Sequence, residues 1–207
     1  MPDHWNLAEL LENSLYLLAL LNPASKVMFL ATYEPRLDRR RIWELAWKSS
    51  LAALIILAVL AGVGEVVLSK VFRVELYSLK ITGGLVLFMI GWIAVREGRF
   101  INRKQHEQQQ SFTDLSLVPL AAPLIAGPGT IAASISGTAQ FGLPFMMVSL
   151  TLAIFVNFVV MLFAVGINRV LEKLHLLGPL IRLTGLIIAA VAVQMIIAGL
   201  RECGLFA

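Results

Sequence analysis

The sequence predicts an all-α, polytopic membrane protein with six transmembrane helices, arranged as two inverted repeats of three helices each. Three observations lead to this fold class. The 207-residue chain is 58% hydrophobic and only 14% charged, which makes it far more apolar than a soluble domain. Long apolar segments recur along the whole chain, and short motifs in its first half return in its second half. We expect one transmembrane domain that spans residues 1–207.

Six apolar segments are each long enough to cross about 30 Å of hydrocarbon, which takes roughly 20 helical residues. They cover about residues 5–32, 46–68, 76–95, 115–139, 143–167 and 180–200. Repeat one therefore extends over about 5–95 and repeat two over about 115–200. The polar linker between them, at about 96–114, contains the run REGRFINRKQHEQQQ. We expect this linker to be a solvated cytoplasmic loop.

Three short matches relate the two halves. The segment KITGG from Lys80 returns as RLTGL from Arg182, and Gly64 matches Gly166 at the same displacement. The segments NPAS and GPGT, around Pro23 and Pro128, also correspond. Such self-similarity at a fixed period indicates a structural repeat. Because each copy contains an odd number of crossings, the second copy enters the bilayer from the opposite side, so the repeats are inverted.

Basic residues are concentrated in the loops of one membrane face. That face has Arg36, Arg39, Arg40, Arg41, Lys48, Arg96, Arg99, Arg103, Lys104, Arg169, Lys173 and Arg182. The other face has Lys70, Arg73, Lys80 and Arg201. Cytoplasmic loops are enriched in Lys and Arg, which predicts a multi-pass protein of the cytoplasmic (inner) membrane with both termini outside. The net charge of +4 is explained by this placement and does not indicate nucleic acid as a partner.

The stretch PLAAPLIAGPGTIAAS interrupts an otherwise uncharged segment with three prolines and two glycines. In lipid, unwound backbone is tolerated only where it faces protein or a water-filled cavity. We therefore expect helices 1 and 4 to be broken near Pro23 and Pro128. The half-helices that begin there would present free N–H groups to the membrane centre, where they favour a carboxylate.

These motifs resemble the MarC family of integral membrane proteins over nearly the whole chain. The matching segments begin at Asn22 (NPAS), Glu34 (EPRLDRRR), Ile81 (ITGGLVLFMIG), Val118 (VPLAAPLIAGPGTIA) and Arg182 (RLTGLIIAAVAVQMIIAGL). The family includes small neutral amino acid transporters. The resemblance implies six helices in inverted threes and transport of amino acids such as glycine and alanine, with protons as a candidate coupling partner.

The predicted substrate site gathers residues from both breaks and from the fifth helix. Its members are Asn22, Pro23, Ala24, Ser25, Gly127, Pro128, Gly129, Thr130, Ser134 and Asn157. For Asn157, an interhelical hydrogen bond is an equal alternative to a cavity-facing role. For Thr130 and Ser134, the alternative is a hydrogen bond to the helix's own carbonyl groups.

Charged residues inside the predicted helices have two interpretations each. Lys26 could pair with a substrate carboxylate or a coupling group, but we expect it to extend its ammonium towards the cytoplasmic interface. Glu9, Glu12 and Glu65 lie near the outer helix ends, where we expect them to rim the protein rather than carry protons.

The leading functional hypothesis is a secondary transporter of small neutral amino acids that works by alternating access. An exporter of another small solute and a passive channel remain alternatives. We expect no enzymatic activity, because the sequence has no HExxH or GxSxG motif and no histidine within a predicted helix. We expect no metal site and no cofactor. A nucleotide-binding GxxxxGK[ST] motif is also absent from the sequence, so an ion gradient or exchange would drive transport.

Overall fold

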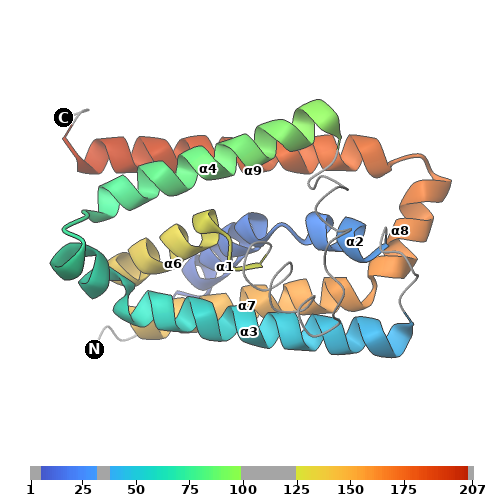
Figure 1. Cartoon of the computed structure of the whole chain (residues 1–207), viewed down its shortest axis with the longest axis horizontal. Coiled ribbons are helices and arrows are strands. Elements are labelled where there is room, and N and C mark those ends of the chain that lie inside the picture. Colours follow the sequence, from blue (N-terminus) through green and yellow to red (C-terminus); the bar gives the residue numbers. More distant parts are fainter. Residues whose placement is uncertain (1–5, 32–37, 99–124, 205–207) are drawn as a thin grey trace.

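The computed structural model describes residues 6–31, 38–98 and 125–204, and every regular element within these ranges is helical. The elements are α1 (Leu7–Leu21), α2 (Pro23–Ala31), α3 (Arg39–Val66), the π-helical turn η1 (Val67–Val71), α4 (Leu76–Glu97), α6 (Pro128–Phe141), α7 (Leu143–Leu162), α8 (Ala164–Lys173) and α9 (Leu177–Glu202). Figure 1 shows an elongated bundle in which α3, α4, α7 and α9 run along the long axis. The predicted all-α class is confirmed.

Four helical segments of the described ranges are long and apolar enough to cross a membrane. They are Arg39–Val71, which joins α3 to η1, and the helices α4, α7 and α9. They coincide with four of the six predicted segments. The predicted segment 5–32 is present as the two shorter helices α1 and α2. Only the second half of the predicted segment 115–139 is described, as α6, and residues 115–124 lie outside the described ranges, as does the linker after residue 98.

The fifth predicted segment, 143–167, is wrong at its end, because the structure divides it. Helix α7 ends at Leu162, Phe163 leaves helical geometry with φ −92° and ψ 3°, and α8 starts at Ala164. In Figure 1, α8 lies across one end of the bundle and connects α7 to α9. Helix α8 carries Arg169, Glu172 and Lys173, and charged residues are stable at the water boundary but not within hydrocarbon.

The predicted break near Pro23 is confirmed. Helix α1 ends at Asn22, whose backbone adopts a left-handed conformation (φ 51°, ψ 73°) and whose N–H donates to the carbonyl groups of Leu18 and Ala19. Asparagine tolerates this conformation better than most residues. Pro23 then opens α2, since proline has no N–H to leave unpaired in a first helical turn. The chain thus restarts its helix in the middle of the bundle (Figure 1).

Helices α4 and α9 form the closest helix pair of the bundle, and small residues make this approach possible. They run antiparallel (Figure 1), and a Cβ added at Gly91 would lie 2.7 Å from the backbone nitrogen of Ala189 and 2.7 Å from the carbonyl oxygen of Gly185. A Cβ at Gly199 would lie 2.8 Å from the carbonyl oxygen of Tyr77. Membrane helices associate through such small-residue contacts, because lipid provides no hydrophobic force between them.

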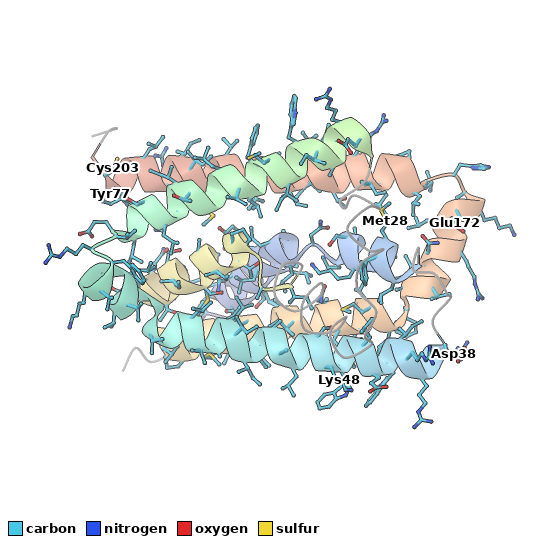
Figure 2. All side chains as sticks on the ribbon, viewed as in Figure 1. Met28, Asp38, Lys48, Tyr77, Glu172 and Cys203 are labelled. Atoms are coloured by element: carbon cyan, nitrogen blue, oxygen red, sulfur yellow. The ribbon has the colours of Figure 1, made fainter. Side chains whose placement is uncertain are left out.

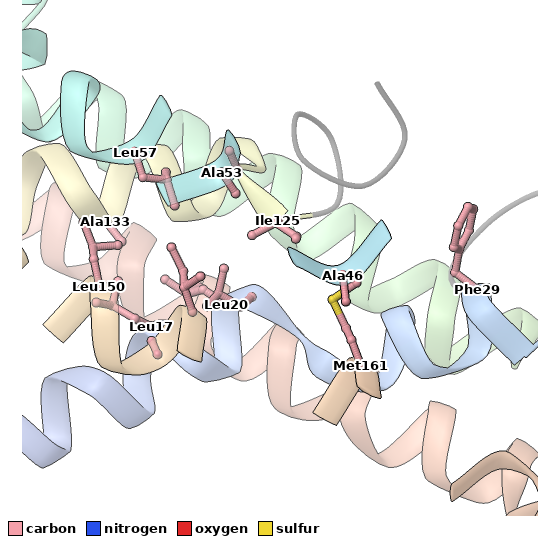
Figure 3. Packing of buried hydrophobic residues seen from close by; sticks show 14 of the residues in the cluster. Leu17, Leu20, Phe29, Ala46, Ala53, Leu57, Ile125, Ala133, Leu150 and Met161 are labelled. Atoms are coloured by element: carbon pink, nitrogen blue, oxygen red, sulfur yellow. The ribbon is translucent and has the colours of Figure 1, made fainter. Parts of the chain in front are cut away.

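The half-helices that follow the two prolines pack against helices of the opposite half of the chain. Helix α2 contacts α7, α8 and α9, whereas α6 contacts α3 and α4. Helix α1 packs along α7, and α3 packs along α7 as well. Figure 3 shows buried side chains from these elements meeting in one core, among them Leu17, Leu57, Leu150 and Met161. The two halves are therefore interleaved rather than placed side by side.

The outer surface of the bundle is apolar along its length and polar at its ends. Exposed large apolar side chains include Ile55, Met89, Phe155 and Leu186, one from each long helix. An apolar surface of this extent suits contact with lipid chains. In Figure 2, Asp38 and Glu172 lie towards one end of the bundle, and Tyr77 and Cys203 lie at the other. Glu9, Glu12 and Glu65 are exposed, as expected for rim residues.

Substitution of Gly91 by alanine should destabilise the protein, because the new methyl group would meet backbone atoms that cannot rotate away. Overpacking of this kind costs about 1–3 kcal/mol. The melting temperature of the Gly91→Ala variant in detergent should therefore be lower than that of the wild type. Gly62→Ala is the matched control, because a Cβ at Gly62 meets no atom within 4 Å. Equal melting temperatures of the two variants would contradict the proposed packing.

Candidate functional site at the helix break

The break between α1 and α2 is buried, and its carbonyl groups are occupied by side chains that follow it. The Asn22 carbonyl oxygen accepts from the Ser25 N–H at 3.1 Å and from Ser25 Oγ at 2.8 Å. Lys26 Nζ donates to the Leu21 carbonyl oxygen and lies 3.4 Å from that of Asn22. Ser25 is 4% exposed and Lys26 is 0% exposed. The unwound turn therefore meets the requirement that buried backbone groups find partners within the protein.

Lys26 does not extend towards the interface, so that expectation is wrong. Side chains on a helix tilt towards its N-terminus, and Lys26 lies in the first turn of α2, which begins at the break. Its aliphatic chain therefore runs back over the break instead of along α2 towards water. The last carbonyl groups of α1, the negative end of its dipole, then attract the ammonium. No carboxylate of residues 6–31, 38–98 or 125–204 lies within ion-pair distance of it.

The second predicted helix break, near Pro128, lies at the start of α6. Gly127 is its N-cap and Pro128 is its first residue, so the first-turn N–H groups of Gly129 and Thr130 have no acceptor within the helix. A Cβ at Gly129 would lie 2.5 Å from Cδ1 of Leu87, which belongs to α4. Leu87 thus covers the first turn of α6 and leaves no room there for a side chain.

Ser134 is fully buried, but its hydroxyl donates to the Thr130 carbonyl oxygen at 2.7 Å. This is the local hydrogen bond that the sequence analysis gave as the alternative for this residue. Thr130 is 2% exposed. Of the predicted site residues on α6, Gly129 and Thr130 therefore have backbone N–H groups that can donate to a ligand. The Ser134 hydroxyl already donates its hydrogen bond within the helix.

Asn157 in α7 is fully buried, and half of its amide has no partner. Its Nδ2 lies 3.5 Å from the sulfur of Met161, a weak acceptor. Its Oδ1 has no hydrogen-bond partner among the described residues. The same holds for the buried hydroxyl oxygens of Ser50 and Ser149. An unpaired buried oxygen costs about 1–3 kcal/mol, so these positions are suited to receiving a donor that enters the bundle.

The helix registers place Asn157 beside the break. Asn13 of α1 contacts the sulfur of Met146 on the parallel helix α7, and Figure 3 shows Leu17 next to Leu150, one turn further on in each helix. Continued to the end of α1, this register sets Ile154 level with Leu21, so Asn157 lies about one turn further on, at the level of the break. The break, its capping lysine and the unpaired amide oxygen thus lie at one depth of the bundle.

Ser50 lies at this depth as well. Helices α3 and α7 run antiparallel (Figure 1), and Ala46 points towards Met161 in Figure 3. One turn inward from that pair, Ser50 faces the level of Asn157. The sequence analysis did not identify Ser50, although a serine pair within the apolar run of α3 was a signal for a buried polar contact.

The start of α6 is placed by its contacts with α3 and α7. A Cβ at Gly64 would contact Ile135 at 2.6 Å, and α3 and α6 run in the same direction (Figure 1). A Cβ at Gly137 would overlap the terminal methyl carbon of Met146. Because α6 and α7 form a hairpin joined at Gly142, this contact sets Pro128 near the level of Phe155, within about one turn of Asn157. The predicted site residues therefore lie on different helices as two groups, one around Asn22 and Asn157 and one around Gly129 and Thr130.

An apolar pocket of about 200 Å³ lies between α2, α7, α8 and α9. Its walls include Val27, Val160 and Ile181, and Ala24 is the predicted site residue that lines it. The walls carry almost no polar surface, so this pocket does not suit a zwitterion. Among the described residues, no group of three or more His, Cys, Asp or Glu side chains could hold a metal ion.

The fold and the buried polar groups define the class of protein: a helical, multi-pass integral membrane protein with an interrupted helix inside its bundle. The family model for MarC family integral membrane proteins matches residues 7–203. The chain belongs to this family, as its motifs predicted.

Several curated membrane proteins are similar to the chain over most of its length. A UPF0056 membrane protein of Pyrococcus horikoshii is 32% identical over 193 residues, which covers 93% of this chain and 94% of the relative. One from Methanocaldococcus jannaschii is 34% identical over 191 residues, with coverage of 88% and 91%. UPF0056 membrane protein YvbG of Bacillus subtilis is 30% identical over 195 residues, with coverage of 89% and 90%. No solved structure matches the chain significantly.

Replacement of Asn157 by leucine should leave the melting temperature unchanged or raise it, because a desolvated oxygen without a partner is removed at similar side-chain volume. Gln194→Leu on α9 is the matched control, since that amide is exposed on the outer surface. A clear loss of stability in Asn157→Leu alone, measured by thermal unfolding in detergent, would show instead that Asn157 forms a stabilising interhelical bond.

Proposed function

We propose that this protein is a secondary transporter that moves small neutral amino acids, of the glycine and alanine type, across the cytoplasmic membrane by alternating access. The observation that carries the proposal is the interrupted helix at Asn22, with charged and unpaired polar groups buried beside it. Polar groups at this depth are costly in hydrocarbon and mark substrate or ion pathways. Discontinuous helices with such groups are typical of secondary transporters.

The packing of α4 against α9 supports the predicted inverted repeat, and with it alternating access. Gly91 meets Gly185, and Gly84 meets the Ala192 carbonyl oxygen, so this antiparallel register sets Leu87 level with Ala189. Leu87 and Ala189 are 102 residues apart in the chain, which is also the displacement between the two predicted copies of the repeat. A two-fold axis that passes between α4 and α9 would produce this relation. The interleaved contacts of α2 and α6 agree, because each packs on the second and third helices of the other half. Two such halves would rock against each other about a central site.

The two polar groups suit the two ends of an amino acid. Its carboxylate would bind the N–H groups of Gly129 and Thr130, because a helix N-terminus favours an anion. Its ammonium would donate to the unpaired oxygens of Asn157 and Ser50. Alternating access would bring these groups together around the substrate. Leu87, which covers Gly129, would restrict the site to small side chains.

We further propose that protons or exchange provide the coupling, and that the chain is a carrier without enzymatic activity. Transport of another small solute and passive conduction are the competing proposals. A channel does not accumulate labelled solute in exchange for unlabelled solute, whereas a carrier does, so counterflow separates the two mechanisms.

Proteoliposomes loaded with unlabelled glycine or alanine should transiently accumulate labelled solute, and Gly129→Leu should abolish the accumulation, because its side chain fills the opening of α6. Gly62→Leu, the same substitution on the outer surface, should retain it.

The double variant Gly129→Leu/Leu87→Ala removes the clash with α4, so a folded double variant that remains inactive supports a blocked site. Normal flux in Gly129→Leu would refute the site. Absence of counterflow in folded wild-type protein, for any small neutral amino acid, would refute the proposed substrate class.

The proposed orientation, with both termini outside, can be tested with the single native cysteine. Cys203 follows α9 at the end of the bundle that has fewer basic residues. A membrane-impermeant thiol reagent should therefore label wild-type protein in intact cells. In a Cys203→Ser background, His175→Cys places a thiol on the exposed loop after α8. That variant should be labelled only after permeabilisation, and the reverse pattern would invert the topology.

A further inference from the structure

We propose that the Lys26 ammonium is a tethered cation that occupies, at the helix break, a site otherwise suited to a free alkali cation such as Na⁺. The consequence is that the wild-type protein needs no alkali cation at this position, and that removal of the side chain creates a Na⁺ site. A role of this site in coupling rests on the proposed transport function, whereas the test described below does not depend on transport.

The first argument is the ligand set around the ammonium. Lys26 Nζ lies against the carbonyl oxygens of Leu21 and Asn22, the last carbonyl groups of α1. These groups form the negative end of the helix dipole. Carbonyl oxygens are ligands that hard cations prefer. In transporters with broken helices, half-helix C-termini and unwound carbonyl groups coordinate Na⁺.

The second argument is the supply of further oxygen ligands at the same depth. Asn157 Oδ1 and Ser50 Oγ are buried and have no partner among the described residues, and the helix registers place both at the level of the break. An ammonium that donates to two carbonyl groups leaves these oxygens unpaired. A free cation at the break would bind the Leu21 carbonyl oxygen, share that of Asn22 with Ser25, and recruit the unpaired oxygens of Asn157 and Ser50 from the neighbouring helices.

The third argument is the charge balance. Lys26 is completely buried and pairs with no carboxylate among the described residues. In its ammonium form, Lys26 thus places one positive charge among neutral oxygens alone. Removal of the ammonium leaves the same oxygens facing the space that the side chain occupied, without a competing anion. A monovalent cation replaces the lost charge one for one.

The test compares melting temperatures in detergent in choline, sodium, potassium and lithium chloride at equal ionic strength. Lys26→Ala should be stabilised by at least one alkali cation, saturably and by several degrees, because a ligand that binds only the folded state raises its stability. Wild type should show no such shift, because its ammonium fills the site. Lys26→Met, which fills the space with an apolar chain, and Lys70→Ala, which removes an exposed lysine, should show none either.

An equal shift in wild type and Lys26→Ala would overturn the inference, as would a folded Lys26→Ala protein that responds to no alkali cation. If Lys26→Ala folds only in an alkali chloride, the inference is supported. If it folds in none of the salts while Lys26→Met folds, the inference fails, because a cation should restore the missing charge. These readouts do not depend on amino acid transport, so they are distinct from failure of counterflow in the wild type.

Discussion

The structure depends on how an interrupted helix is accommodated inside an apolar bundle. Hydrocarbon offers no hydrogen bonds, so each carbonyl group freed by the break must find a partner in the protein. Here the partners come from the next turn of the same chain: the Ser25 N–H and hydroxyl, and the Lys26 ammonium. Because the solution is local, the break can exist without a contact from α6.

The close contact of α4 with α9 is the second feature on which the structure depends, beside the helix break at Asn22. Glycines let the two backbones approach along most of their length, and van der Waals contact of this kind is the main source of helix association in membranes. Leu87 projects from this pair towards Gly129 at the start of α6. The rigid helix pair therefore reaches directly into the region where we propose the substrate carboxylate binds.

If the buried polar groups served only folding, they would lower the stability of the protein. A buried ammonium and several unpaired oxygens cost free energy that apolar side chains of similar size would not. Proteins retain such groups mainly where function needs them, and activity then opposes maximal stability. Ser149 and Asn168 also have unpaired buried oxygens, but the Lys26 ammonium and the oxygens of Asn157 and Ser50 share the depth of the helix break, and this group connects the packing of the bundle to its proposed function.

The sequence by itself determined the class of the protein, its family and the positions of its long helices. Apolar segments and proline positions are local properties, so the break at Pro23 and the start of α6 at Pro128 could be predicted. The division of the fifth segment into α7 and α8 was not predicted. A count of apolar residues over a long segment does not show where the chain must leave the hydrocarbon so that Arg169 and Lys173 reach water. The direction of Lys26, the unpaired oxygen of Asn157 and the participation of Ser50 were decided only by the tertiary structure. The direction of Lys26 follows from the exact residue at which the helix breaks. The environments of Asn157 and Ser50 depend on the register between helices far apart in the chain, and that register is determined by side-chain packing, which no local pattern encodes.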